Sequence, residues 1–161
     1  MCDSDLMEIQ TRPATFGDAK PIETLLPRLA AFEPLPPGRE RDDLWRPDLN
    51  GLRAWVGGTQ PDTSVRVATN RGDIVGAGIV TYGPEPFTSQ LNAHLLAIVV
   101  APSVDGQGVG QRLMTELDAE ARRRGAATMS LNVFTANERA RSLYERLGFH
   151  EELIRAVRRL T

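Results

Sequence analysis

The sequence predicts a mixed α/β fold in which helices cover the faces of a single β-sheet. Three observations support this fold class. Two apolar segments, 65–68 and 74–82, flank the turn Asn70-Arg71-Gly72-Asp73, a pattern typical of an antiparallel hairpin. The most apolar segment, 93–100, is followed by a helical repeat and then by another strand-like segment, 128–134. Strands joined through one helix are parallel with a right-handed crossover, so the sheet contains both orientations.

The first 30 residues predict a strand and a helix. Residues 9–12 form a short strand that Pro13 ends, after a polar lead-in at 1–6 that we expect to be disordered. Asp18 is a suitable N-cap for the helix, whose apolar residues recur at spacings of three and four from Ile22 to Leu29. Pro27 is expected to kink this helix or to end it early.

A loop and a second helix come next. The segment 31–38 is rich in proline, which restricts the backbone and predicts a long loop. The second helix is expected from about 40 to 56, with Pro47 near its start. Its inward-facing residues are expected to be Leu52, Trp55 and Val56.

A third helix is predicted after the strand 93–100. Apolar residues at spacings of four mark its buried face, and oppositely charged residues at the same spacing can pair on its solvent side. Gly125 is a natural end for this helix. The buried positions are Leu113, Leu117 and Ala121, and the pairs are Asp118 with Arg122 and Glu120 with Arg124.

The C-terminal part predicts a last helix and a last strand. Thr135 and Glu138 match the S/T-x-x-E capping box, and the helix that they begin ends at Gly148. Residues 149–160 are expected to form one or two strands. The predicted order of elements is therefore β-α-α-β-β-β-α-β-α-β.

Length and composition predict one domain over 1–161. The chain has 161 residues, 41% hydrophobic and 25% charged, with a net charge of -2, which is ordinary for a globular domain. The near balance of charges argues against nucleic acid as a partner, and no apolar run is long enough to cross a membrane. The one cysteine, Cys2, cannot form an internal disulfide, so we expect a cytoplasmic protein. Cys2, His94 and His150 lack the spacing of metal ligands, so no metal is expected.

A glycine-rich segment, Asp105-Gly106-Gln107-Gly108-Val109-Gly110, lies between the most apolar strand and the third helix. Glycines at alternate positions remove the Cβ atoms that would keep a ligand from the backbone. Successive amides then converge at a helix N-terminus, which suits a pyrophosphate. The pattern matches nucleotide motifs poorly, because Gln111 follows where a P-loop needs lysine, and the G-x-G-x-G spacing is not that of a dinucleotide fingerprint.

The sequence resembles the GNAT superfamily of N-acetyltransferases over most of its length. The family pattern Q/R-x-x-G-x-G/A, preceded by a strand ending in V-x-P, is similar to Val100-Ala101-Pro102 and Gln107-Gly108-Val109-Gly110. The second family signature, N-x-x-A-x-x-L-Y-x-x-x-G-F, is matched by Asn137, Ala140, Leu143, Tyr144, Gly148 and Phe149. The resemblance implies a fold with a splayed parallel strand pair, acetyl-CoA as co-substrate and direct acetyl transfer to an amine.

The resemblance also implies site residues. The residues expected to bind acetyl-CoA are Ile98, Val99, Val100, Gly106, Gln107, Gly108, Val109, Gly110, Gln111, Arg112, Asn137 and Tyr144. Asp105 stands where the family usually has Gln or Arg. We interpret its carboxylate as an acceptor for the next amides of the turn, with Arg112 supplying the positive charge.

Two residues are candidates for the chemistry. Tyr144 matches the family tyrosine that donates a proton to the CoA sulfur, and a phenol stays protonated at neutral pH. His94 occupies the position at which some relatives have a glutamate base, and alternation along the strand would put it on the face of Leu96, Ile98 and Val100. A chain of waters near Tyr82, Glu85 or Asn92 is the alternative base.

The acceptor is not defined by the sequence. By resemblance its pocket would be formed by 32–43, 83–92 and 150–152, where the acids Glu33, Glu40, Asp42 and Asp43 would attract a cationic amine or stay solvated. A small molecule and a peptide terminus both fit. Homodimers are common in the family, and nothing in the chain fixes its oligomeric state. The alternatives to an enzyme are a non-catalytic CoA-binding or sensing domain of the same fold and a nucleotide-binding protein.

Overall fold

The computed structural model describes residues 7–160. The expected disordered lead-in at 1–6, including Cys2, lies outside the described residues. Within 7–160, no helix is both long and apolar enough to cross a membrane. In the same range, no three His, Cys, Asp or Glu side chains are grouped to hold a metal ion.

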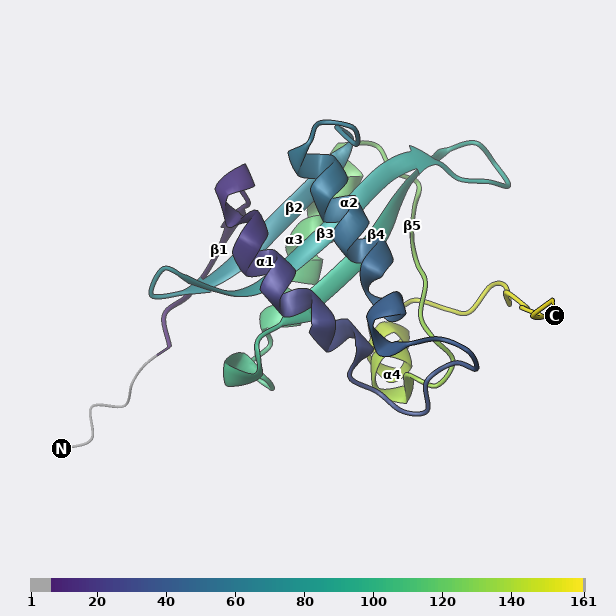
Figure 1. The fold of residues 1–161 in the computed structure, drawn as a ribbon. Coiled ribbons are helices and arrows are strands. Elements are labelled where there is room, and N and C mark those ends of the chain that lie inside the picture. Colours follow the sequence, from purple (N-terminus) through teal and green to yellow (C-terminus); the bar gives the residue numbers. More distant parts are fainter. Residues whose placement is uncertain (1–6, 161) are drawn as a thin grey trace.

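The core of the fold is a five-stranded sheet in the order β1-β2-β3-β4-β5 (Figure 1). Its neighbouring strands are antiparallel except for β4 and β5, which are parallel as predicted. A two-residue turn at Arg71 and Gly72, both with positive φ, joins β2 to β3. The strands are β1 (Ile9–Pro13), β2 (Thr63–Asn70), β3 (Asp73–Pro84), β4 (Leu91–Val100) and β5 (Thr128–Leu131).

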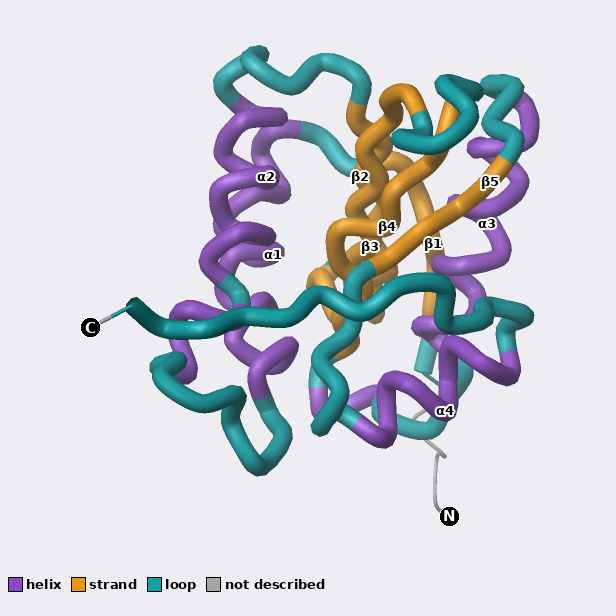
Figure 2. The backbone as a smooth tube through the Cα atoms, turned by 90° about the vertical axis from the view of Figure 1, so that its right-hand side faces the viewer, coloured by secondary structure: helices purple, strands orange, loops and turns teal. Residues whose placement is uncertain are grey.

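Helices cover both faces of this sheet, as Figure 2 shows edge-on. On one face lie α1 (Ala19–Leu25) and α2 (Arg46–Val56), and on the other lies α3 (Val109–Arg123). The last helix, α4 (Glu138–Arg146), packs below α3 at the end of β4. Short 3-10 helices occupy Phe16–Asp18, Leu26–Ala30, Arg41–Leu44 and Pro102–Val104.

The hydrophobic core is divided by the sheet. On the α1 and α2 face, Ile22, Leu26 and Leu52 pack on apolar side chains of β2, β3 and β4. On the other face, Leu113 and Leu117 of α3 are fully buried against the sheet. The predicted ion pairs Asp118–Arg122 and Glu120–Arg124 are present on the outer side of α3. The helical periodicity of the sequence therefore identified the buried face of α3 correctly.

A β-bulge in β4 changes which side chains share a face. Ile79 of β3 is opposite Ala97 and Val80 is opposite Leu95, so Leu96 is an extra residue. Leu96, Ala97 and Val99 pack on the α1 and α2 face, whereas Leu95 and Ile98 pack on the α3 face. The prediction that His94 shares a face with Ile98 and Val100 is therefore wrong. The run Leu95-Leu96-Ala97 is apolar throughout, so it carries no alternation that would reveal the bulge.

The two predicted N-caps have different outcomes. Asp18 is the N-cap residue of α1 as expected, but its carboxylate makes no capping bond, because it binds Arg12 at 2.6 Å and accepts a hydrogen bond from the amide of Thr15. In α4, Asn137 and not Thr135 is the N-cap, since its Oδ1 accepts from the amide of Ala140 at 3.2 Å. The cap of α4 is two residues later than predicted, a shift that leaves the apolar periodicity of the helix unchanged.

The expected second helix is divided. Residues 41–44 form a 3-10 turn, and α2 begins at Arg46, with Pro47 in its first turn, where proline is tolerated. Leu52 is buried as expected, but Val56 is 40% exposed, so its inward assignment was wrong. The position four residues before Leu52 is instead the buried Asp48.

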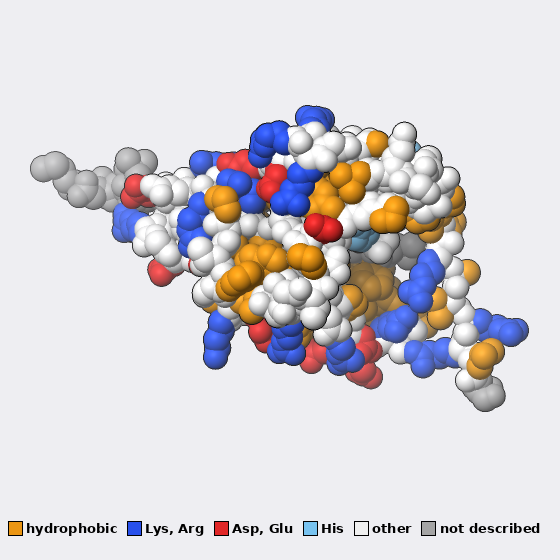
Figure 3. Space-filling view, turned by 90° about the horizontal axis from the view of Figure 1, so that it is seen from above, with side chains coloured by type: hydrophobic (Ala, Val, Ile, Leu, Met, Phe, Trp, Pro, Cys, Tyr) orange, Lys and Arg blue, Asp and Glu red, His pale blue; other side chains and the backbone are white. Residues whose placement is uncertain are grey.

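The C-terminal strands are shorter than expected or absent. β5 ends at Leu131 and not at Phe134, and the described residues after Phe149 form no strand. This segment runs across the open end of the fold (Figure 2), and basic side chains lie along its exposed end (Figure 3). The apolar residues that suggested strands are all exposed, because they have no neighbouring strand to pair with: Leu153, Ile154, Val157 and Leu160.

The packing of α3 gives a test of the fold. Leu117→Ala should lower the free energy of unfolding by about 2–5 kcal/mol, because it removes a fully buried side chain that contacts β3. Thr115→Ala on the exposed side of the same helix should change it by less than about 0.5 kcal/mol. Urea unfolding followed by circular dichroism measures both, and equal effects would contradict the assigned face.

Candidate active site

The sheet opens into a fork between β4 and β5. The two strands pair only from Asn92–Thr128 to Leu95–Leu131, after which β4 continues alone to Val100. The amide of Ala101 donates to the carbonyl of Val75 on β3, so alternation directs the backbone groups of Val99 toward β3 as well. The backbone groups of Ile98 and Val100 face the open side of the fork. A sheet edge of this kind offers hydrogen-bonding groups to an extended ligand.

The glycine-rich segment lies where β4 ends. Gly106 and Gly108 have φ of +75° and +74°, a conformation that favours glycine, and a Cβ at either would meet no atom within 4 Å. Gly108 is the N-cap of α3, and the first helical hydrogen bond runs from the amide of Arg112 to its carbonyl. The amides of residues 108–111 therefore have no acceptor within the helix. Open amides at the N-terminus of a 15-residue helix have the geometry that suits an anion, so the binding of pyrophosphate here stays a prediction.

An arginine that the sequence analysis missed connects the fork to this loop. Arg28, in the 3-10 helix after α1, donates to the carbonyl of Val100 and also pairs with Asp105, with Nη2 and Oδ2 3.1 Å apart. Asp105 thus binds a side chain and not the next amides, which corrects our interpretation of its role. Hydrogen bonding to Arg28 lowers the pKa of the Asp105 carboxyl, and the charge of Arg139 adds to this effect.

Arg112 does not supply the expected positive charge to the loop. Its Nη1 donates to the carbonyl of Ile9 on β1 at 3.0 Å. Among the described residues, the cations that act on Asp105 are Arg28, in the 3-10 helix after α1, and Arg139, in the first turn of α4. Neither is a matched position of a family motif, so only the fold brings them there.

Tyr144 lies on α4 beside the fork. Its ring packs edge-on against Phe149, with centroids 5.9 Å apart, and contacts the core cluster of α3. Burial raises the pKa of its phenol, and the charge of Asp48 raises it further. The phenol therefore keeps its proton at neutral pH and can donate it. Asn137, seven residues earlier, uses its side-chain oxygen to cap the same helix.

His94 lies at the closed end of the fork, on the α1 and α2 face. Its Nδ1 is 2.9 Å from Ser130 Oγ, and Ser130 also accepts from Asn92, which in turn accepts from Thr128. These side chains connect β4 to β5 where the strands are still paired. Burial lowers the pKa of His94, so the imidazole is neutral at neutral pH and able to accept a proton.

Comparison with known proteins identifies the family. The sequence profile of the acetyltransferase (GNAT) family matches residues 26–149, which include the fork, the loop and α4. The chain belongs to the GNAT family.

Individual relatives agree with this assignment. The GNAT chain is 44% identical over 63 residues to the ribosomal protein bS18-alanine N-acetyltransferase of Escherichia coli, and this alignment covers 39% of the chain and 43% of that enzyme. It thus spans less than half the length of the first curated relatives that it matches. It is 30% identical over 147 residues to the thialysine N-epsilon-acetyltransferase of Bos taurus, covering 87% and 83% of the two chains.

Solved structures share the fold. An aminoglycoside N-acetyltransferase crystallised with CoA superimposes with a TM-score of 0.69 at 18% identity, covering 95% of each chain. At this identity the likeness concerns the architecture alone. It confirms the predicted mixed sheet with helices on both faces.

Several acids in the segments expected near an acceptor already have partners within the GNAT chain. Glu33 pairs with Arg41, and Asp43 pairs with Arg46, so these two acids already have cationic partners. Glu85 accepts hydrogen bonds from its own loop at Phe87 and Thr88.

Tyr82, a candidate for the water-mediated base, and Glu151, in a segment expected near the acceptor, also contact other residues. Tyr82 lies on the α3 face under Arg124, whose guanidinium carbon is 4.4 Å from the ring centroid. Near the C-terminus, Glu151 accepts from Arg141.

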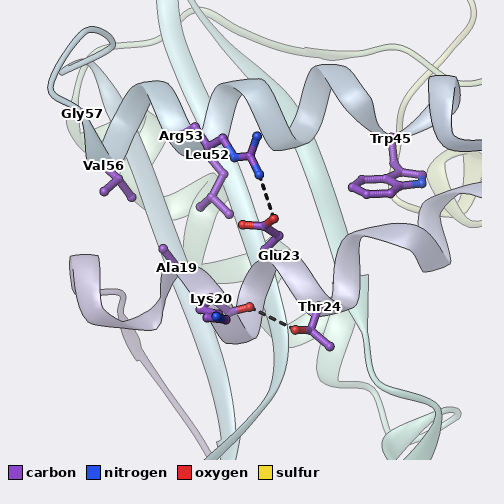
Figure 4. Close-up of a pocket in the computed structure, with 9 residues that line it drawn as sticks. All are labelled: Ala19, Lys20, Glu23, Thr24, Trp45, Leu52, Arg53, Val56 and Gly57. Carbon is purple, nitrogen blue, oxygen red and sulfur yellow. Dashed lines mark hydrogen bonds and ion pairs between the residues drawn. The ribbon is translucent and has the colours of Figure 1, made fainter.

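A groove between α1 and α2 is separate from the fork. It has a volume of about 690 Å³ and is lined by residues of both helices, including Trp45 and Leu52 (Figure 4). An ion pair between Arg53 and Glu23, 3.0 Å long, crosses it. None of the predicted site residues lines this groove, so the fork remains the candidate active site of the GNAT chain.

Proposed function

We propose that the chain is an N-acetyltransferase that moves the acetyl group of acetyl-CoA directly to an amine. The observation that carries this proposal is the forked β4–β5 pair, with open amides at the end of β4 and a protonated phenol beside the gap. A turn that only reversed the chain would not need two glycines of positive φ with open space around them. Family membership and the names of the relatives, all N-acetyltransferases, support the same function.

Acetyl-CoA fits the fork from its pyrophosphate to its thioester. The amides of residues 108–111 would bind the pyrophosphate, with Arg28 and Arg139 supplying positive charge. The backbone groups of Ile98 and Val100 would bind the pantetheine arm as an added strand does. Because Arg28 occupies the carbonyl of Val100, that carbonyl becomes available only when the guanidinium turns to the phosphates.

The transfer then needs three events. The acceptor nitrogen must be neutral before it attacks the thioester carbonyl and forms the new C–N bond. The C–S bond breaks, and the departing sulfur takes the proton of the Tyr144 phenol. The nitrogen loses its surplus proton, which restores the phenol. Tyr144 is suited to this step because its raised pKa keeps it protonated until the sulfur needs the proton.

The direct test is ligand-dependent stability followed by turnover. Acetyl-CoA at 100 times its Kd should stabilise the fold by about 2.7 kcal/mol and raise the Tm by about 5–10 °C. ATP and NAD should leave the Tm unchanged. CoA release with a panel of primary amines then separates an enzyme from a CoA-binding domain. Stabilisation without release from any amine would remove the proposed activity.

Tyr144→Phe should lower kcat by about 10²–10⁴-fold and leave the Kd of acetyl-CoA unchanged, because the phenol acts on the sulfur during transfer. Tyr82→Phe is the matched control, since it removes the other tyrosine hydroxyl, which lies on the same face of the sheet but accepts a hydrogen bond from Ser64 on β2. Steady-state kinetics and calorimetric titration measure both quantities. Equal kcat values in the two variants would exclude the proton-donor role.

Gly108→Ala should weaken acetyl-CoA binding, because its Cβ would project among the open amides and its backbone would be strained. Gly58→Ala is the control: Gly58 has φ of +75° with open space around it, but it follows α2. Each variant should lose about 1–2 kcal/mol of stability for the left-handed conformation. Only Gly108→Ala should change the Kd. Equal Kd values would show that the loop does not bind the co-substrate.

A further inference from the structure

Asp48 is a buried carboxylate on α2 that the steps above do not use. It is 8% exposed and lies four residues from both Leu44 and Leu52, which are also buried. It therefore belongs to the inward-facing stripe of the helix. One turn later, a Cβ on Gly51 would overlap the side chain of Leu96, so α2 approaches β4 closely at the bulge. Asp48 thus faces the sheet beside the fork and not the solvent.

The Asp48 carboxylate has no partner side chain among the described residues. It accepts a hydrogen bond only from its own backbone amide. The acids on the preceding segment differ, because Glu33 and Asp43 are exposed enough to hydrate and each binds an arginine. Burial of a carboxylate is unfavourable without a cation or several donors. Burial accordingly raises the pKa of Asp48 to about 7.

Asp48 and Tyr144 lie near the same end of β4. In Figure 2 the first turn of α2 and the helix α4 flank the lower end of the sheet from opposite sides, at the point where β4 and β5 separate. In agreement with this placement, the charge of Asp48 adds to burial in raising the pKa of the Tyr144 phenol. The fork therefore has a phenol on the α4 side and a carboxylate on the α2 side.

We propose that Asp48 binds the protonated acceptor amine and takes its proton before the attack on acetyl-CoA. The inference rests on the proposed function and adds the acceptor class, a primary amine that is cationic at neutral pH. The ammonium nitrogen gives one proton to the carboxylate, which leaves a neutral amine and a carboxylic acid. The amine then forms the C–N bond, and the carboxylic acid returns its proton to solvent.

The environment of Asp48 suits both parts of this role. An ammonium group is the complement of a buried carboxylate without a partner, and the pair would be strong where water is excluded. A carboxyl that titrates near neutrality also exchanges protons readily at the working pH. The neighbouring titratable groups are Tyr144 on α4, which holds its proton, and His94 on β4, which is neutral. On α1, Glu23 already pairs with Arg53.

Asp48→Asn tests the proposal, because it keeps the size of the side chain and removes its charge and basicity. With a primary amine that the wild-type chain acetylates, kcat/KM for the amine should fall by about 10²–10⁴-fold at neutral pH. The Kd of acetyl-CoA should stay unchanged. The deficit should shrink as the pH rises toward the pKa of the free amine, since the acceptor then arrives neutral. Asp48→Glu should restore part of the activity.

Controls separate this role from a structural one. Asp118→Asn removes an exposed carboxylate on α3 and should leave kcat/KM unchanged. In Asp48→Asn the phenol of Tyr144 should also titrate at lower pH in ultraviolet difference spectra, since one charge that raises its pKa is gone. A variant that acetylates the amine within threefold of wild type at every pH overturns the role of Asp48 alone. A wild-type chain that acetylates no amine overturns both proposals.

Discussion

The separation of β4 from β5 is the constraint on which the site depends. A fully paired sheet would use the backbone groups of Ile98 and Val100 in its own ladder and leave none for a ligand. The strands are held together at one end by the side chains of Asn92, Thr128 and Ser130. Beyond Leu131, the chain turns away and Phe134 packs on Phe32, with ring centroids 5.7 Å apart. The fork is therefore fixed by packing at both of its arms.

The bulge at Leu96 gives the two sides of the fork different chemistry. It moves Ile98 and Val100 onto the α3 face, toward α4, and leaves His94 on the α2 face. Tyr144 on α4 lies on the same side as Ile98, the side of the proposed leaving sulfur, while Asp48 on α2 and His94 lie on the side proposed for the acceptor. An unbulged strand would put His94 and Val100 on one face. One inserted residue thus separates proton donation from proton acceptance.

Much of this arrangement is predictable from the sequence, because local patterns determine it. The hairpin, the apolar stripe of α3 and the glycines at 106 and 108 all follow from period, turn chemistry or φ preference. Contacts between distant segments are not predictable in this way. Arg28 pairs with Asp105 across 77 positions, and the charge of Asp48 acts on Tyr144 across about 100 positions. The segment after Phe149 shows the opposite case. Its composition is typical of a strand, but it forms none because no neighbouring strand pairs with it.

The charge distribution indicates where the fold gives up stability. The pKa of Asp18 is lowered to about 2 by Arg12, so this pair adds stability that is lost as the pH falls through that value. Asp48 has the opposite effect on stability, because its pKa is raised from 3.8 to about 7 in the folded chain. The folded chain therefore loses on the order of 4 kcal/mol as the pH rises from about 4 through 7. That is a large part of the 5–15 kcal/mol that stabilises a typical domain. Leucine or asparagine at position 48 would avoid this penalty. A bound cationic acceptor would also remove this penalty. The burial of an ionisable carboxylate at position 48 is therefore explained by a role in binding and not by a role in the core.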